Sequence, residues 1–190
     1  PKNCWEKIGG RLYSFDANGY MRGGGWYLEM GTWYYLESSG AAKEGWLLLG
    51  DTWYYLQPGT GKMLTGWQKV NGTWYYMNGS GAMLTGWQNI GGTWYYMNGS
   101  GAMLTGWQKI GGTWYYMNGS GAMLTGWQKI NGTWYYMDGS GAMLANRWVD
   151  GYYYVGANGA MVTSSYVGGY YVGADGRWIP GYDPVISGGS

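Results

Sequence analysis

Residues 66–85 read GWQKVNGTWYYMNGSGAMLT, and this stretch recurs almost letter for letter from residues 86, 106 and 126. Weaker copies begin at Gly25 and Gly45. Degenerate units lie around Trp5, around Trp148 and over residues 166–178, which brings the count to about nine. A unit of about 20 residues is too short to bury a core of its own, so neighbouring units must stack.

Each unit has the pattern of a β-hairpin. The runs GWQKV and TWYYM are rich in aromatic and β-branched residues, and only Asn71-Gly72 separates them. Asn-Gly between two such runs is a strong hairpin signal, because a type I′ turn needs positive φ at both positions. The following NGSGAMLT is a connector, and no helical period is present anywhere in the sequence. We therefore predict an all-β fold of about nine stacked hairpins.

The ends of the chain depart from the repeat. We predict a repeat domain over residues 1–179, whose degenerate first and last units act as caps, and a linker-like tail over residues 180–190. The chain starts at Pro1 without a signal peptide, so we expect a mature protein or an excised segment.

The composition excludes several functions. The 190 residues include no His, which removes Ser-His-Asp and Cys-His catalysis and His-ligated zinc. A net charge of +1 without a basic cluster argues against nucleic acid as a partner. No apolar stretch reaches the roughly 18–20 residues that span a bilayer, and Cys4 has no second cysteine to pair with. Residues 52–137 contain no Asp or Glu, so the paired carboxylates of a glycosidase are not expected. We predict no enzymatic activity, no metal and no cofactor.

The turn at 71–72 sets a register that gathers aromatic side chains. Trp67 and Trp74 share one face of the hairpin and lie diagonally across it. When hairpins stack, this face meets the opposite face of the next unit, which presents Tyr95, and the connector supplies Met83. Such a cage of electron-rich rings suits a quaternary ammonium ion such as choline.

Two other interpretations stay open at this point. The aromatic residues could form only the stacking core of a repeat protein, since strands favour them in any case. However, the chain uses 15 Trp and only 1 Phe, although the simpler apolar ring of Phe would fill a core equally well. The alternative function is a carbohydrate (glucan)-binding repeat array, because aromatic platforms also stack on sugars. Sugar sites, however, need polar groups fixed around the ring.

The motif GWQK-NG-TWYYMN-GSGAMLTGW resembles the choline-binding repeats of pneumococcal-type surface proteins and phage lysins, over roughly residues 5–178. The resemblance implies a β-solenoid, wound as a left-handed superhelix. It also implies phosphocholine groups of teichoic and lipoteichoic acids bound between consecutive repeats, which would hold the protein on the bacterial cell surface, or bring a phage lysin to the wall. The full-length protein would carry a catalytic or adhesin domain.

The resemblance assigns each cage two tryptophans of one repeat, a tyrosine of the next and often a methionine. The expected cages are Trp46, Trp53 and Tyr75 with Met63; Trp67, Trp74 and Tyr95 with Met83; Trp87, Trp94 and Tyr115 with Met103; Trp107, Trp114 and Tyr135 with Met123; and Trp127, Trp134 and Tyr153 with Met143.

Three junctions are expected to be weaker. Trp26, Trp33 and Tyr54 keep the rings but have Ala42 at the methionine position, so one wall is missing. The junctions near Trp5 and near Trp148 are expected to be caps.

Overall fold

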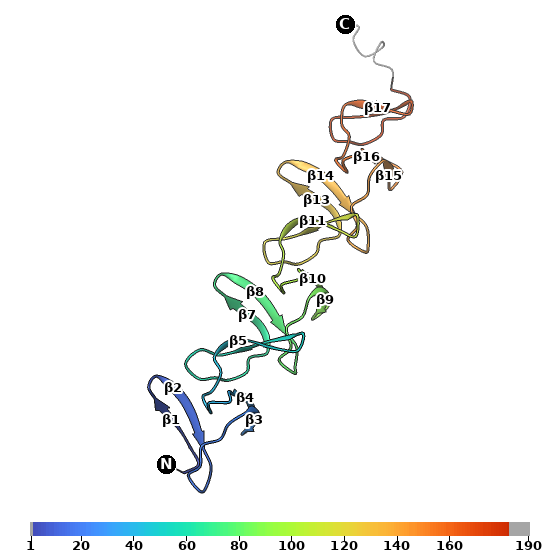
Figure 1. The fold of residues 1–190 in the computed structure, drawn as a ribbon. Coiled ribbons are helices and arrows are strands. Elements are labelled where there is room, and N and C mark those ends of the chain that lie inside the picture. Colours follow the sequence, from blue (N-terminus) through green and yellow to red (C-terminus); the bar gives the residue numbers. More distant parts are fainter. Residues whose placement is uncertain (1, 183–190) are drawn as a thin grey trace. The chain divides into compact units, whose positions relative to one another are not determined.

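The computed structural model describes residues 2–182, and within them every regular element is a β-strand. The 18 strands form nine antiparallel two-stranded sheets, each a hairpin of consecutive strands (Figure 1). The strands are β1 (Cys4–Ile8), β2 (Arg11–Phe15), β3 (Gly25–Glu29), β4 (Thr32–Leu36), β5 (Gly45–Leu49), β6 (Thr52–Leu56), β7 (Gly66–Val70), β8 (Thr73–Met77), β9 (Gly86–Ile90), β10 (Thr93–Met97), β11 (Gly106–Ile110), β12 (Thr113–Met117), β13 (Gly126–Ile130), β14 (Thr133–Met137), β15 (Arg147–Val149), β16 (Tyr153–Val155), β17 (Ser165–Val167) and β18 (Tyr170–Val172). The predicted all-β class and the nine hairpins are confirmed.

The hairpin turns have the backbone that the sequence requires. Asn71 and Gly72 have φ of 49° and 84°, the pair of positive values that defines a type I′ turn. The strands around the turn then pair Trp67 with Tyr76 and Lys69 with Trp74. The two tryptophans of a repeat therefore lie on one face and diagonally across the ladder, as predicted.

In almost every hairpin, the last residue of the second strand belongs to the core. Its side chain is at most 2% exposed in eight of the nine hairpins, and these residues are Leu36, Leu56, Met77, Met97, Met117, Met137, Val155 and Val172. The dry interior of the repeat is thus aliphatic, and the tryptophans are not part of it.

From the second hairpin on, the connector that follows a hairpin turns back and contacts the hairpin before it in the sequence. The side-chain oxygen of Asn78 accepts hydrogen bonds from two backbone N–H groups of its own turn, at 3.0 Å each. This turn brings Met83 opposite Met77 in an isolated β-bridge. The backbone N–H of Met83 then donates to the carbonyl of Trp53 at 2.8 Å. A connector is therefore anchored one hairpin earlier than its place in the sequence suggests.

The chain comprises two compact units. The first runs up to Gln88 and includes Tyr96–Met103, and the second combines Asn89–Tyr95 with the residues from Leu104 onward. Each unit contains several complete hairpins, so each contains aromatic faces with their partners.

The packed part of the second unit extends slightly beyond the predicted domain end at 179. The ring of Tyr182 stacks on Tyr171 with centroids 3.9 Å apart, and the Tyr166 hydroxyl donates to the carbonyl of Tyr182. Most of the predicted tail, residues 183–190, lies outside the described residues. Residues 2–182 form no helix that could cross a membrane.

Candidate functional site

Where a hairpin carries two tryptophans, its face holds the two indoles nearly at right angles. In the second unit, the ring centroids of Trp107 and Trp114 lie 6.2 Å apart with an interplanar angle of 90°. Trp107 also packs edge-on against Tyr116, its cross-strand neighbour, at 5.1 Å. Perpendicular contacts are favourable because the positive edge of one ring meets the negative face of another. The hairpin therefore holds its two indoles as two walls of a corner.

The next hairpin supplies the third wall. Tyr135 of β14 lies 4.8 Å from Trp107 at an angle of 73°. In the first unit, Tyr75 stands in the same relation to Trp46, and Tyr54 to Trp26, at 4.8 and 4.9 Å. The structure therefore brings together the predicted rings of these cages.

The second tryptophan of each pair is only partly covered. Its side chain is between 39% and 43% exposed in six hairpins, and these residues are Trp33, Trp53, Trp74, Trp94, Trp114 and Trp134. An indole that served only the core would be buried, as the neighbouring methionines are. The arrangement thus presents an aromatic face to solvent next to two further rings.

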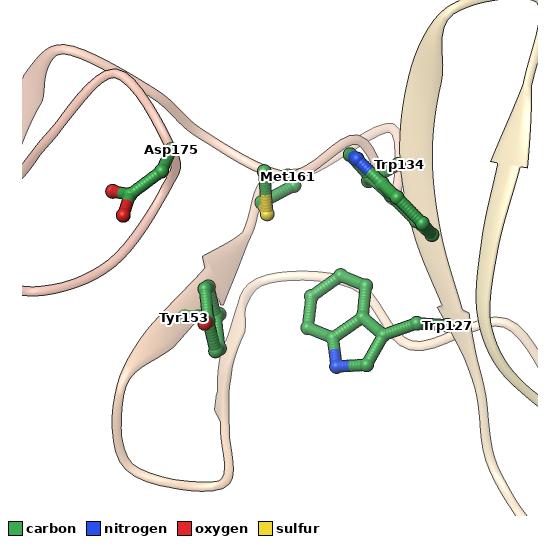
Figure 2. Close-up of a pocket in the computed structure, with 5 residues that line it drawn as sticks. All are labelled: Trp127, Trp134, Tyr153, Met161 and Asp175. Carbon is green, nitrogen blue, oxygen red and sulfur yellow. The ribbon is translucent and has the colours of Figure 1, made fainter.

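One cage encloses a measurable cavity. Trp127, Trp134, Tyr153 and Met161 line a hollow of about 320 Å³, together with Asp175 (Figure 2). Tyr153 lies 5.4 Å from Trp127. The volume lies at the lower end of the range for small-molecule sites, so the rings leave room for a small ligand. The carboxylate was not expected in an aromatic cage.

The methionine of each cage is not the one that was predicted. In the cavity, Met161 replaces the expected Met143. Met161 donates its backbone N–H to the carbonyl of Trp134, whereas Met143 donates to Trp114. The equivalent backbone bond places each of the other methionines one hairpin earlier than predicted. The pairs are Met63 with Trp33, Met83 with Trp53, Met103 with Trp74 and Met123 with Trp94. The prediction placed each connector between its own hairpin and the next, but the turn at its start reverses the chain.

This shift also corrects the interpretation of the cage around Trp26 and Trp33. Ala42 donates its N–H to the carbonyl of Leu12 and belongs with the first hairpin. Met63 takes the methionine position beside Trp33. The wall that was expected to be missing is therefore present.

Two expected cages contain residues of both units and stay predictions. They are the cage of Trp67, Trp74 and Tyr95 and the cage of Trp87, Trp94 and Tyr115. Within the first unit, Trp67 and Trp74 form the same corner, 6.2 Å apart at 89°.

The junction at the amino-terminal end is filled. Trp5 lies 4.6 Å from Tyr34 at an angle of 40°, and its indole N–H donates to a carboxylate oxygen of Glu29. Tyr34 is only 8% exposed, and burial raises the pKa of its phenol. The rings of this junction therefore pack against each other, and its role as a cap stays a prediction.

The junction at the other end is open, contrary to the expected cap. Trp148, Gly151, Tyr170 and Trp178 line a second cavity of about 320 Å³. Tyr170 meets Trp148 and Trp178 at right angles, at 5.9 and 5.6 Å. The backbone N–H of Trp178 donates to the carbonyl of Tyr152, as that of Met161 does to the carbonyl of Trp134. Trp178 could not be predicted as a wall of this cavity, because the methionine position is defined by this backbone bond and not by residue type.

Charged groups are sparse near the cages. The ammonium groups of Lys69, Lys109 and Lys129 lie 5.6 to 5.9 Å from the ring centres of Trp74, Trp114 and Trp134. Over residues 2–182, no group of three or more His, Cys, Asp or Glu side chains could hold a metal ion. The Trp127 cavity is lined by three aromatic rings and a thioether, with Asp175 as the one charged lining residue in the described part of the chain.

Tandem hairpins with aromatic cages at their junctions define a ligand-binding repeat protein. Profiles of the choline-binding repeat match residues 64–105, 104–148 and 146–178. A profile of a putative cell wall binding repeat matches residues 24–42 and 44–63. The chain belongs to the choline-binding repeat family, and it is a choline-binding cell-wall module.

Solved structures agree with this assignment. CbpJ from Streptococcus pneumoniae TIGR4 is 42% identical with a TM-score of 0.82, over 89% of this chain and 62% of that protein. Choline binding protein F from Streptococcus pneumoniae is 43% identical with a TM-score of 0.78, over 89% of this chain and 61% of that one. The choline-binding domain of CbpL from the same species is 32% identical with a TM-score of 0.69, over 94% and 98%. The chain thus spans about three fifths of the CbpJ and CbpF structures. No curated protein sequence matches it.

Proposed function

We propose that this chain holds a protein on the bacterial cell wall by binding phosphocholine groups of teichoic and lipoteichoic acids in its aromatic cages. Each cage would take one trimethylammonium group between two tryptophans, a tyrosine of the next hairpin and the methionine anchored beside the second tryptophan. Its ligand would be choline or phosphocholine, and no cofactor would be needed.

The half-exposed second tryptophan carries this proposal. Trp114 keeps 40% of its surface exposed while Met117, three residues later, is fully buried. The exposed indole gains free energy when a ligand covers it, because apolar surface costs free energy in water. A trimethylammonium group matches this surface, since its methyls are apolar and its charge is attracted to the ring faces.

The energies indicate weak single sites. A cation–π contact contributes roughly 0.5–2 kcal/mol, so three rings give about 1.5–6 kcal/mol, which corresponds to dissociation constants from about 80 mM to about 40 μM, with millimolar values in the middle of the range. Several such sites on one chain would nevertheless retain it on a polymer that carries many choline groups, because the second and later contacts are intramolecular. Wall anchoring thus depends on the repetition of the cage.

We further propose that the module itself is not catalytic and that it serves a catalytic or adhesin domain of the full-length protein. The paucity of carboxylates supports this, since residues 52–137 contain none. The protein would act at the cell surface, or on the wall if it belongs to a phage lysin.

A choline titration followed by tryptophan fluorescence tests the proposal. We expect saturable quenching or a spectral shift at millimolar choline, and a melting temperature that rises with choline because the ligand binds only the folded chain. Glucose oligomers at equal concentration are the control and should change neither signal. An unchanged spectrum and melting temperature with choline, together with a response to the oligomers, would point to a sugar-binding array instead.

A further inference from the structure

The cavity of the Trp127 and Trp134 cage has one charged lining residue among the described residues. Asp175 joins Tyr153 and Met161 on one side of the cavity, with Trp127 and Trp134 on the other (Figure 2). A carboxylate beside a cation site changes both the strength and the selectivity of binding, so its origin in the fold matters.

Asp175 occupies a position that the repeat defines. It precedes Gly176, where an added Cβ would lie 2.5 Å from the sulfur of Met161. One repeat earlier, Asn158 precedes Gly159, where an added Cβ would lie 2.4 Å from the sulfur of Met143. The two turns therefore cross over equivalent methionines.

The hydrogen bonds of the two turns also match. The Oδ1 atom of Asp175 accepts from the N–H of Arg177, and that of Asn158 accepts from the N–H of Ala160, at 3.0 Å each. An aspartate and an asparagine thus form the same turn, and the two turns differ in charge at this position.

The charge of Asp175 is available to a ligand. Its side chain is exposed, and over residues 2–182 it forms no ion pair. The nearby guanidinium of Arg177 lies over the ring of Tyr152, 4.8 Å from its centre. The ammonium of Lys129 lies at the ring of Trp134, 5.9 Å from its centre.

We propose that Asp175 makes the Trp127 cage a site for tertiary ammonium ions that carry an N–H, in addition to the quaternary ions that all cages take. This inference rests on the proposed function. A trimethylammonium group has no proton to donate, whereas a dimethylammonium group can donate one to a carboxylate in a charge-assisted hydrogen bond. In a cage without a carboxylate, loss of one methyl group weakens binding about fourfold. At the Trp127 cage, we expect the exposed carboxylate to raise the affinity for the tertiary ammonium ion about two- to fivefold.

Methyl NMR of the chain labelled with 13C at the methionine methyls can resolve the two cages. The Met161 signal reports the Trp127 cage and the Met143 signal reports the Trp107 cage, with assignments from single Met→Leu variants. Choline and N,N-dimethylethanolamine, which is protonated at neutral pH, are titrated separately. The ratio of their dissociation constants is then compared at the two methyls in the native chain and in the reciprocal variants Asp175→Asn and Asn158→Asp.

We expect the two ligands to bind within about twofold of each other at Met161 and about fourfold apart at Met143. Asp175→Asn should raise the ratio at Met161 to the value at Met143, and Asn158→Asp should lower the ratio at Met143. If choline titrates both methyls but the ratios are equal and neither variant changes them, the inference is wrong and the proposed function stands. If choline shifts neither methyl, the proposed function fails, and the inference fails with it.

Discussion

At the scale of single residues, buried aliphatic side chains and methionines form the core of a repeat, and half-exposed tryptophans form its cage. Met117 is fully buried and fills the interior, whereas Trp114 of the same strand keeps 40% of its surface exposed. Their side chains are three residues apart on one strand, so successive pleats send them to opposite faces. Stability and binding can therefore be changed independently.

A pair of substitutions on this strand tests the separation. Trp114→Ala should remove one choline site and cost only about 1 kcal/mol of the free energy of unfolding, because the indole is half-exposed. Met117→Ala should cost about 2–5 kcal/mol, because it opens a cavity in the core. Calorimetric choline stoichiometry and urea unfolding measure the two effects. A Trp114→Ala chain with an unchanged number of sites would contradict the cage.

A second prediction concerns acid and the connector turns. Asp138 takes the place that Asn118 holds one repeat earlier, and the hydrogen bond from the Ser140 hydroxyl holds its pKa below the ordinary value of 3.8. Because the folded pKa is lowered, the ionised turn stabilises the fold above pH 3.8. This contribution is lost as the pH falls through the folded pKa.

Replacing Asp138 by Asn should therefore flatten this part of the pH dependence, since the amide oxygen accepts the same backbone bonds, as in Asn118. Unfolding of both chains by urea between neutral pH and pH 3 makes the comparison. The idea is refuted if the two chains lose stability in parallel on acidification.

At the scale of elements, the connector rather than the strand completes a cage. The hairpin orients two indoles, but the methionine arrives from the connector of the following hairpin and is held by one backbone bond to the second tryptophan. In the Trp107 cage this bond joins the N–H of Met143 to the carbonyl of Trp114 at 2.8 Å. The next connector then passes over Met143 at Gly159.

Gly159→Ala tests this contact. The glycine has φ of +80°, and an added Cβ would lie 2.4 Å from the Met143 sulfur, so the thioether must move. We expect a loss of about 1–2 kcal/mol from the strained backbone and weaker choline binding at this cage by about two- to tenfold, the worth of a sulfur–aromatic contact.

The matched control is Gly112→Ala in the turn between β11 and β12. It has a similar φ of +85°, but nothing lies within 4 Å of the added Cβ. It should lose stability without moving Met143. Equal effects of the two variants on binding, measured at the Met143 methyl, would show that strain alone is responsible.

At the scale of the whole molecule, the proposed binding would be shared among cages in two units. The rings of each cage come from adjacent hairpins, so the loss of one cage should leave the others intact. On a wall with many choline groups, however, the contributions of the individual sites to the overall affinity multiply, because later contacts are intramolecular.

Trp33→Ala in the first unit and Trp134→Ala in the second test this property. Each variant should lower the number of sites that bind free choline by one, and the double variant should lower it by two. Retention on choline-bearing cell walls should fall in the double variant by about the product of the single effects, because the contacts act through effective concentration. Elution by free choline is the control, and retention that falls only with the sum would argue against multivalent anchoring.

The sequence by itself determined the hairpins, their register and the identity of the rings. The reason is local, since a two-residue turn with positive φ dictates which residues face one another, and the alternation of side chains places Trp107 and Trp114 on one face. It also determined the family, because the motif repeats at nearly constant spacing. The handedness of the expected superhelix stays a prediction.

Only the tertiary structure decided which connector serves which cage. The reversal at each connector moves Met143 from the Trp127 cage to the Trp107 cage, and the same reversal brings Trp178 and Asp175 into cavities that no local pattern assigns to them. These contacts join residues of different hairpins through single backbone bonds and turns. Their pairing depends on how successive hairpins stack, which spacing along the chain does not encode.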